Sequence, residues 1–198
     1  MSELSFMDKL LDGAKVELLN LSQVTKIKHG KDWKGLNAGD IPVYGSGGIM
    51  GYVDEYAYDK PTVLIPRKGS ITNIFYVESP FWNVDTIYSV GVRDIDTLHP
   101  DFAYYLLKQS ELKLTGIQQK GGIPAVSKKQ MEELLLPIPS IYKQERIVAI
   151  LDKFDTLTTS ISEGLPREIE LRQKQYEYYR DLLLSFPKPD ASKSEAAA

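Results

Sequence analysis

The sequence predicts an α+β fold, with a mixed β-rich domain followed by a long helical coiled-coil arm. Residues 1–140 are rich in glycine, aromatic and β-branched residues, whereas residues 141–186 contain a single glycine. The two parts meet at Leu136-Pro137-Ile138-Pro139-Ser140, which cannot be helical because proline removes a backbone donor and restricts the residue before it. We therefore expect a domain over 1–140, a helical region over 141–186 and a disordered tail over 187–198.

Short apolar runs bounded by glycine, proline or polar turns predict the strands of the first domain. Residues 16–27 have the apolar content of a strand or a short helix, and a polar loop is expected after them. The other expected strands cover residues 41–44, 62–66, 71–77 and 86–90. A stiff, extended hinge is expected at 136–140.

Two short helices are expected in the same domain. His99-Pro100-Asp101 opens a helical stretch over 102–107, with Pro100 near the first turn, where a missing N–H is harmless. Ser127 is expected to cap a second helix that runs to Leu134, because its hydroxyl can accept a hydrogen bond from an early backbone N–H.

The arm is predicted by apolar residues at alternating spacings of three and four, which is the pattern of a coiled-coil seam. This seam consists of Ile147, Ile150, Phe154, Leu157 and Ile161. A helix over 141–163 would be about 35 Å long. Gly164-Leu165-Pro166 then forms either a hairpin or a kink before a second helix. That helix carries one apolar stripe of Ile169, Tyr176 and Leu183 and another of Leu171, Tyr178 and Leu182, which suggests two neighbours. The seam either folds back on its own chain or meets a second copy.

Composition excludes several classes of protein. The chain of 198 residues has no cysteine and two distant histidines, so neither disulfides nor a metal site is expected. No apolar run reaches membrane-spanning length, and the acidic N-terminus does not resemble a signal peptide, which together favour the cytoplasm. The net charge of −3 excludes a non-specific nucleic-acid coat protein. No nucleophile, acid or base motif is present, so no catalytic residue and no cofactor are expected.

Two basic segments are candidates for DNA contact. Lys26, Lys28, Lys31 and Lys34 could contact phosphates, although a solvated loop explains them equally well. Arg67, with Lys68 and Ser70, lies in an expected turn between strands. An arginine held there can present its planar fork to guanine O6 and N7, or can merely block edge-to-edge sheet pairing.

Two loops complete the candidate surface. Ser46 lies in the turn Gly45-Ser46-Gly47-Gly48, which lacks the spacing of a nucleotide-binding loop and is better suited to a tight turn near DNA. Gln119 and Lys120 could contact bases or phosphate from a second loop. The aromatic residues of the domain are expected at core or half-buried sheet positions rather than as base-stacking residues; they are Tyr52, Tyr56, Tyr58, Phe75 and Tyr76.

Several motifs resemble those of one family. They are 134–140 followed by Gln144-Glu145-Arg146-Ile147 and Leu151, then 164–169 with Arg172, Gln175, Tyr176, Tyr179 and Arg180, and earlier 44–49, 66–70 and 99–106. This pattern, which extends over nearly the whole chain, is similar to that of the specificity subunits of type I restriction-modification systems. The junction and the helical segment are its most specific parts.

The resemblance implies a target-recognition domain that reads double-stranded DNA, a conserved helical region, and partners that are DNA methyltransferase subunits and restriction or motor subunits. A full-length subunit of the family has two recognition domains, whereas this chain resembles half of one. Two copies joined along the seam would together have two recognition domains. A homodimer that binds a bipartite palindromic site is therefore expected. A coiled-coil adaptor without base readout is the alternative.

Overall fold

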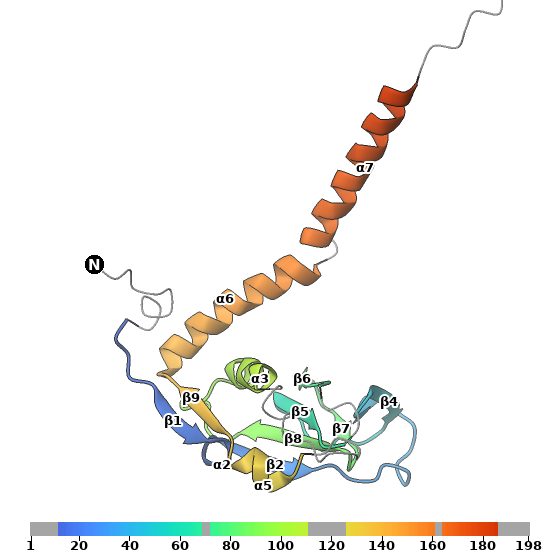
Figure 1. Cartoon of the computed structure of the whole chain (residues 1–198). Helices are drawn as coiled ribbons and strands as arrows, with labels where there is room; N and C mark the ends of the chain where they lie inside the picture. The colour runs from blue at the N-terminus through green and yellow to red at the C-terminus, as the bar shows by residue number, and fades with distance from the viewer. Residues whose placement is uncertain (1–11, 69–71, 111–125, 161–163, 186–198) are drawn as a thin grey trace, which may run out of the picture. The chain divides into compact units, whose positions relative to one another are not determined.

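The computed structural model describes residues 12–68, 72–110, 126–160 and 164–185 (Figure 1). The chain divides into two compact units, residues 1–149 and 150–198. Among the described residues, all strands belong to the first unit, which accords with the α+β expectation. The predictions for Ser70, Gln119, Lys120, Ile161 and the tail 187–198 lie outside the described residues.

A four-stranded antiparallel sheet forms the centre of the first unit, in the order β2-β8-β5-β6. Its strands are β2 (Thr25–His29), β5 (Thr62–Pro66), β6 (Phe75–Val77) and β8 (Ile87–Val92). Every residue of β5 is buried. This strand lacks the alternation of a half-exposed strand because hydrophobic residues cover both of its faces.

The N-terminal segment is a strand, a helix and a strand in succession: β1 (Glu17–Asn20), α2 (Leu21–Val24) and β2. The side chain of Gln23 accepts a hydrogen bond from the backbone N–H of Asn20 at 2.7 Å, which closes the start of α2. The expected polar loop is present but begins after His29 rather than after residue 27. Strand β2 continues to His29 because its residues Thr25–His29 pair with Tyr88–Val92 of β8.

The proline-rich junction is a strand rather than only a hinge. Residues Leu135–Ile138 form β9, which pairs antiparallel with β1. In this register Pro137 lies opposite Leu18, at the edge of a two-stranded sheet, where a missing donor is tolerated.

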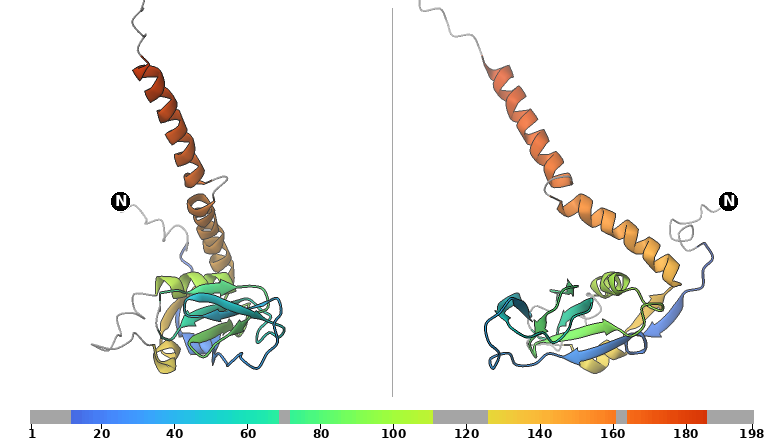
Figure 2. Two further views of the ribbon diagram at one scale, coloured as in Figure 1. Left: turned by 90° about the vertical axis from the view of Figure 1, so that its right-hand side faces the viewer. Right: turned by 180° about the vertical axis from the view of Figure 1, so that it is seen from behind.

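A second sheet contains β3 (Ile41–Gly45), β4 (Gly48–Val53) and β7 (Trp82–Asn83), in the order β4-β3-β7 (Figure 2). β3 and β4 form a hairpin, and Gly48 adopts a φ of 117°, which favours glycine. Tyr58, Phe75 and Tyr76 are half-buried, as predicted. The prediction is wrong for Tyr52 and Tyr56, which are 54% and 55% exposed, because β4 is an edge strand and Tyr56 follows it outside any strand.

Both predicted helices of the first unit are present. They are α3 (Pro100–Gln109), with Pro100 in its first turn, and α5 (Lys128–Glu132). The Ser127 hydroxyl accepts a hydrogen bond from the backbone N–H of Gln130 at 3.2 Å, as a helix cap. The main core lies between α3 and the four-stranded sheet (Figure 1), and it includes Val63, Tyr88 and Phe102.

The helical region consists of α6 (Ile141–Thr159) and α7 (Leu165–Leu184). The first turns of α6 belong to the first unit, where Gln144 and Val148 are buried. Gly164 precedes α7 and donates its N–H to the carbonyl of Ser160 at 3.2 Å. A Cβ at Gly164 would lie 2.9 Å from that same oxygen, so the position favours glycine. In the described part of the chain, no helix is long and apolar enough to cross a bilayer.

Candidate nucleic-acid interface

Three segments converge at one end of the four-stranded sheet, because β2 and β5 both run antiparallel to β8. In this register His29 and Ile65 both lie opposite Tyr88. The residues that follow β2 and β5 therefore meet the residues that precede β8. We call this region the basic edge and define it as Lys28, Lys31, Lys34, Arg67 and Lys68.

Backbone contacts hold the segment after β2 against the segment before β8. The N–H of Gly30 donates to the carbonyl of Ile87 at 3.2 Å, and the N–H of Lys31 donates to the carbonyl of Asn83 at 2.9 Å. A Cβ at Gly30 would collide with the carbonyl oxygens of Asn83 and Val84. Glycine at position 30 thus permits the close approach that places Lys31 at the end of the sheet.

Arg67 is held by several contacts. Its backbone N–H donates to the carbonyl of Thr86 at 2.9 Å, and its Nη1 donates to the carbonyl of Asp85 at 3.3 Å. The Nη1 atom also lies 3.5 Å from Nδ1 of His29, and the guanidinium carbon lies 5.9 Å from the centre of the Tyr88 ring. The side chain therefore has a preferred position, as a group that reads a base edge requires.

Tyr88 supports Arg67 as a neutral phenol. Burial raises the pKa of Tyr88, and the Arg67 guanidinium opposes that rise. The hydroxyl donates to the carbonyl of Val126 at 3.2 Å, and the ring packs edge-on against His29 with centroids 4.9 Å apart. These contacts join β2, β5 and β8 beneath the guanidinium.

Lys28 and Lys31 line a cavity of about 400 Å³ on one side of the basic edge. The Nζ of Lys28 lies 5.0 Å from the centre of the Tyr58 ring, within the range of a cation–π contact. Lys26 and Lys28 are exposed on the same face of β2, whereas Ile27 between them is buried. These two lysines therefore lie on a strand and not on the loop that the sequence suggested.

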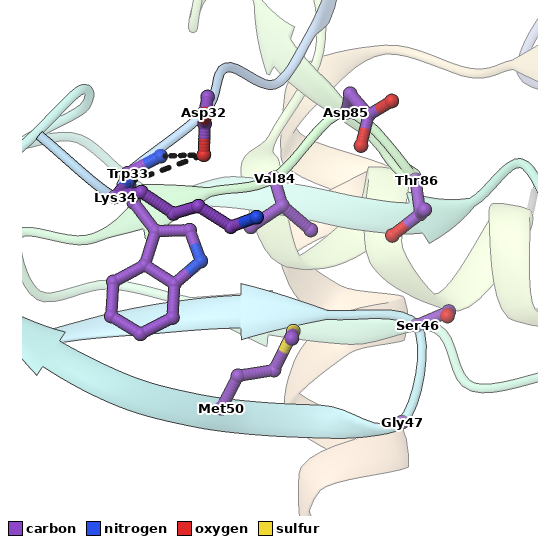
Figure 3. A pocket seen from close by; sticks show the side chains of 9 residues that line it. All are labelled: Asp32, Trp33, Lys34, Ser46, Gly47, Met50, Val84, Asp85 and Thr86. Carbon is purple, nitrogen blue, oxygen red and sulfur yellow. Dashed lines mark hydrogen bonds between the residues drawn. The ribbon is translucent and has the colours of Figure 1, made fainter.

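A second hollow, of about 760 Å³, is drawn in Figure 3. Three segments form it: the loop 32–34, the β3–β4 hairpin and the turn 84–86. Its lining residues are Asp32, Trp33, Lys34, Ser46, Gly47, Met50, Val84, Asp85 and Thr86. Asn73 donates to the carbonyl of Ser46 at 3.2 Å and so supports the hairpin turn.

The structure thus brings together predicted residues from three separate segments: Lys31 and Lys34, Ser46, and Arg67. Sequence reasoning did not assign a DNA role to Trp33, Met50, Asp85 or Thr86, which also line this region. The available signal was the short turn Val84-Asp85-Thr86 between two buried strands, since side chains at such turns share the end of a sheet.

The second unit presents the other candidate surface. Four residues of the predicted seam and stripe are at least 60% exposed: Phe154 (60%), Ile169 (67%), Tyr176 (61%) and Leu183 (76%). Leu157 is 50% exposed and Ile150 is partly buried. Ile147 packs against the main core of the first unit. No side chain of helix α7 is buried. Within the described residues its apolar stripe is therefore exposed.

A β-rich domain with cations gathered at one sheet end, followed by two long helices with exposed apolar residues, defines an α+β protein with a helical region. The chain belongs to the family of type I restriction modification DNA specificity domains, whose family model matches residues 14–171. It is 53% identical over 91 residues to the EcoR124I/EcoR124II specificity subunit of Escherichia coli, covering 45% of this chain and 22% of that one. A putative specificity subunit of Haemophilus influenzae is 37% identical over 166 residues, with coverage of 76% and 42%.

Solved structures share the fold. The S subunit from M. genitalium matches with a TM-score of 0.67 at 21% identity, over 86% of this chain and 46% of that one. The subunit from Thermoanaerobacter tengcongensis matches with a TM-score of 0.61 at 18% identity, over 87% and 48%. The chain therefore spans less than half the length of these solved relatives.

Proposed function

We propose that this chain reads double-stranded DNA for a type I restriction-modification assembly and performs no catalysis itself. In this role it directs DNA methyltransferase subunits, and restriction or motor subunits, to a defined site. The observation that carries the proposal is the basic edge, where lysines from the β2 segment and Arg67 at the end of β5 share one end of a rigid sheet. Lysines there supply salt-dependent affinity, and a fixed arginine supplies base readout.

We further propose that the chain acts as a homodimer. The exposed apolar stripe of α7, in a chain that belongs to this family, supports this. A two-fold dimer through α6 and α7 would carry two identical recognition domains. Such a dimer predicts a bipartite palindromic site whose spacer is set by the helical arms.

Methylation mapping tests the function in cells. The gene is expressed with its methyltransferase subunits, and the methylated motif is read by sequencing genomic DNA. The expected result is a split palindrome that disappears when this gene is deleted. A motif that persists after deletion, or one without a spacer, contradicts the proposal.

The second candidate function is a coiled-coil adaptor that tethers proteins without reading bases. The net charge of −3 favours it, because DNA-binding proteins commonly carry a positive charge. The same mapping separates the two functions. An adaptor would leave the motif unchanged when Arg67 is replaced, whereas a reader would alter it.

A further inference from the structure

An exposed carboxylate, that of Asp85, lies beside the basic edge. Asp85 lines the larger hollow with Lys34, and its backbone carbonyl accepts the Nη1 donor of Arg67. Within the described residues, its carboxylate makes no hydrogen bond and no ion pair. At a surface that faces DNA, such an anion repels phosphate, so its presence calls for a positive or hydrogen-donating group on the ligand.

Asp85 and Arg67 are held beside each other by the backbone. Arg67 donates its N–H at 2.9 Å to the carbonyl of Thr86, the residue after Asp85, and its Nη1 lies 3.3 Å from the Asp85 carbonyl. Its Nε and Nη2 atoms make no hydrogen bond within the described part of the chain. The free Nε and Nη2 donors of Arg67 and the carboxylate of Asp85 therefore belong to neighbouring residues at the same end of the sheet.

This arrangement is the complement of one base pair. In the major groove guanine presents the acceptors O6 and N7, and its partner cytosine presents the N4 amino donor. We propose that Arg67 and Asp85 together read one G·C pair, with the guanidinium donating to guanine O6 and N7 and the carboxylate accepting from cytosine N4. This inference rests on the proposed DNA-reading function and names the base pair that this part of the surface takes.

The floor of the hollow favours cytosine over adenine as the partner of Asp85. Trp33, Met50 and Val84 line the same hollow as Asp85 and give it apolar surface (Figure 3). Cytosine presents its apolar C5 edge beside the N4 amino group, whereas adenine presents the N7 acceptor beside its N6 amino group. An acceptor placed against a carboxylate is repelled, so the pyrimidine fits this hollow and the purine does not.

The first test maps the methylation motif with the whole chain and its methyltransferase subunits. The variants are Asp85→Ala, Arg67→Lys and, as a matched control, Asp96→Asn. Asp96 is an exposed aspartate beyond the opposite end of β8, so its replacement changes the charge far from the basic edge. Asp85→Ala and Arg67→Lys are expected to relax the motif at the same G·C pair, and Asp96→Asn to leave it unchanged.

The second test isolates the N4 amino group. Binding of the assembled complex is measured by fluorescence anisotropy on the mapped site and on a site whose cytosine is replaced by 2-pyrimidinone, which lacks that group. The wild-type complex is expected to bind the altered site roughly 5- to 150-fold more weakly, the range of one specific base contact. The Asp85→Ala complex is expected to distinguish the two sites only slightly, because the acceptor is already absent. Thermal unfolding of Asp85→Ala should match the wild type, since the side chain has no partner within the described residues.

The outcomes separate the inference from the function on which it rests. A wild-type complex that methylates a defined motif, with Asp85→Ala leaving every position intact, overturns the inference and leaves the reading function standing. Relaxation by the two variants at base pairs that are not shared overturns it as well. A wild-type chain that directs no motif at all overturns both.

Discussion

The side-chain oxygen of Gln144 accepts a hydrogen bond from the backbone N–H of His99 at 2.8 Å. The amide nitrogen of Gln144 donates to the carbonyls of Thr97 and Pro139, at 2.9 and 2.8 Å. Gln144 is fully buried in the first turns of α6. One side chain thus ties the start of the helical region to the segment that precedes α3 and to the proline-rich junction, so the motif around Gln144 has a structural explanation.

Replacing Gln144 with alanine should strongly destabilise the first unit. The change removes the partner of one N–H and of two carbonyls, of which that of Pro139 belongs to a buried residue, and each group left unsatisfied away from water costs on the order of 1 kcal/mol or more. We expect a decrease of roughly 2–4 kcal/mol in the free energy of unfolding. Urea denaturation followed by the fluorescence of Trp33 and Trp82, which both lie in this unit, measures it. The control is Gln173→Ala on exposed α7, expected to change stability by less than about 0.5 kcal/mol. Equal values for the two variants would contradict the role of Gln144.

Gly30→Ala should be destabilising for a steric reason. An added Cβ would overlap the carbonyl oxygens of Asn83 and Val84, and the backbone must then shift at the sheet end. We expect a cost of about 2 kcal/mol or more, together with weaker DNA binding, because Lys31 moves with this segment. Gly35→Ala is the control, since a Cβ there meets no atom within 4 Å and its φ is not positive. Comparable urea midpoints for both variants would show that the close approach at Gly30 is unimportant.

The local structure of the first domain could be predicted from the sequence where the chemistry is local. The cap at Ser127, the proline in the first turn of α3 and the break at Gly164 follow from rules about neighbouring residues. Strand β9 was missed as a strand because Pro137 argues against a central position. Only its partner β1, more than a hundred residues earlier, shows that an edge position was available.

The candidate site was predictable in part. The lysines and Arg67 are visible as charged residues in turns, but their meeting depends on the register of β2 and β5 on β8, which no local pattern specifies. Asp85 carries no signal by itself, because an isolated aspartate in a turn is common. Asp85 indicates a binding role only in the folded structure, where Arg67 lies beside it.

Lys28 and Lys31 should contribute affinity without specificity. Replacing both with alanine removes two cations from the basic edge, so binding of the assembled complex should weaken on all DNA sequences alike. The slope of log K against log salt should become shallower by about 0.9 for each phosphate that is no longer neutralised by a lysine. Anisotropy titrations over a series of salt concentrations measure this. Lys60→Ala, at the opposite end of β5, is the control and should leave the slope unchanged. A slope that the double replacement does not alter would remove these lysines from the interface.

Ile169→Lys should convert the proposed dimer into a monomer. Ile169 is 67% exposed in the single chain, on a helix that buries none of its side chains, and a second copy would cover it. A lysine at the centre of an apolar seam must then shed its hydration without gaining a partner. Size-exclusion chromatography with light scattering should give about twice the chain mass of 22.3 kDa for the wild type and the single-chain mass for the variant. Asp181→Asn changes the charge by the same single unit at an exposed position of α7, two residues before Leu183 and so on a different face from the stripe; it should remain dimeric if the apolar stripe forms the interface. A wild type that elutes as a monomer at micromolar concentration would leave the exposed stripe to a different partner, such as a methyltransferase subunit. Dissociation by both variants alike would instead point to charge, rather than reduced apolar burial, as its cause.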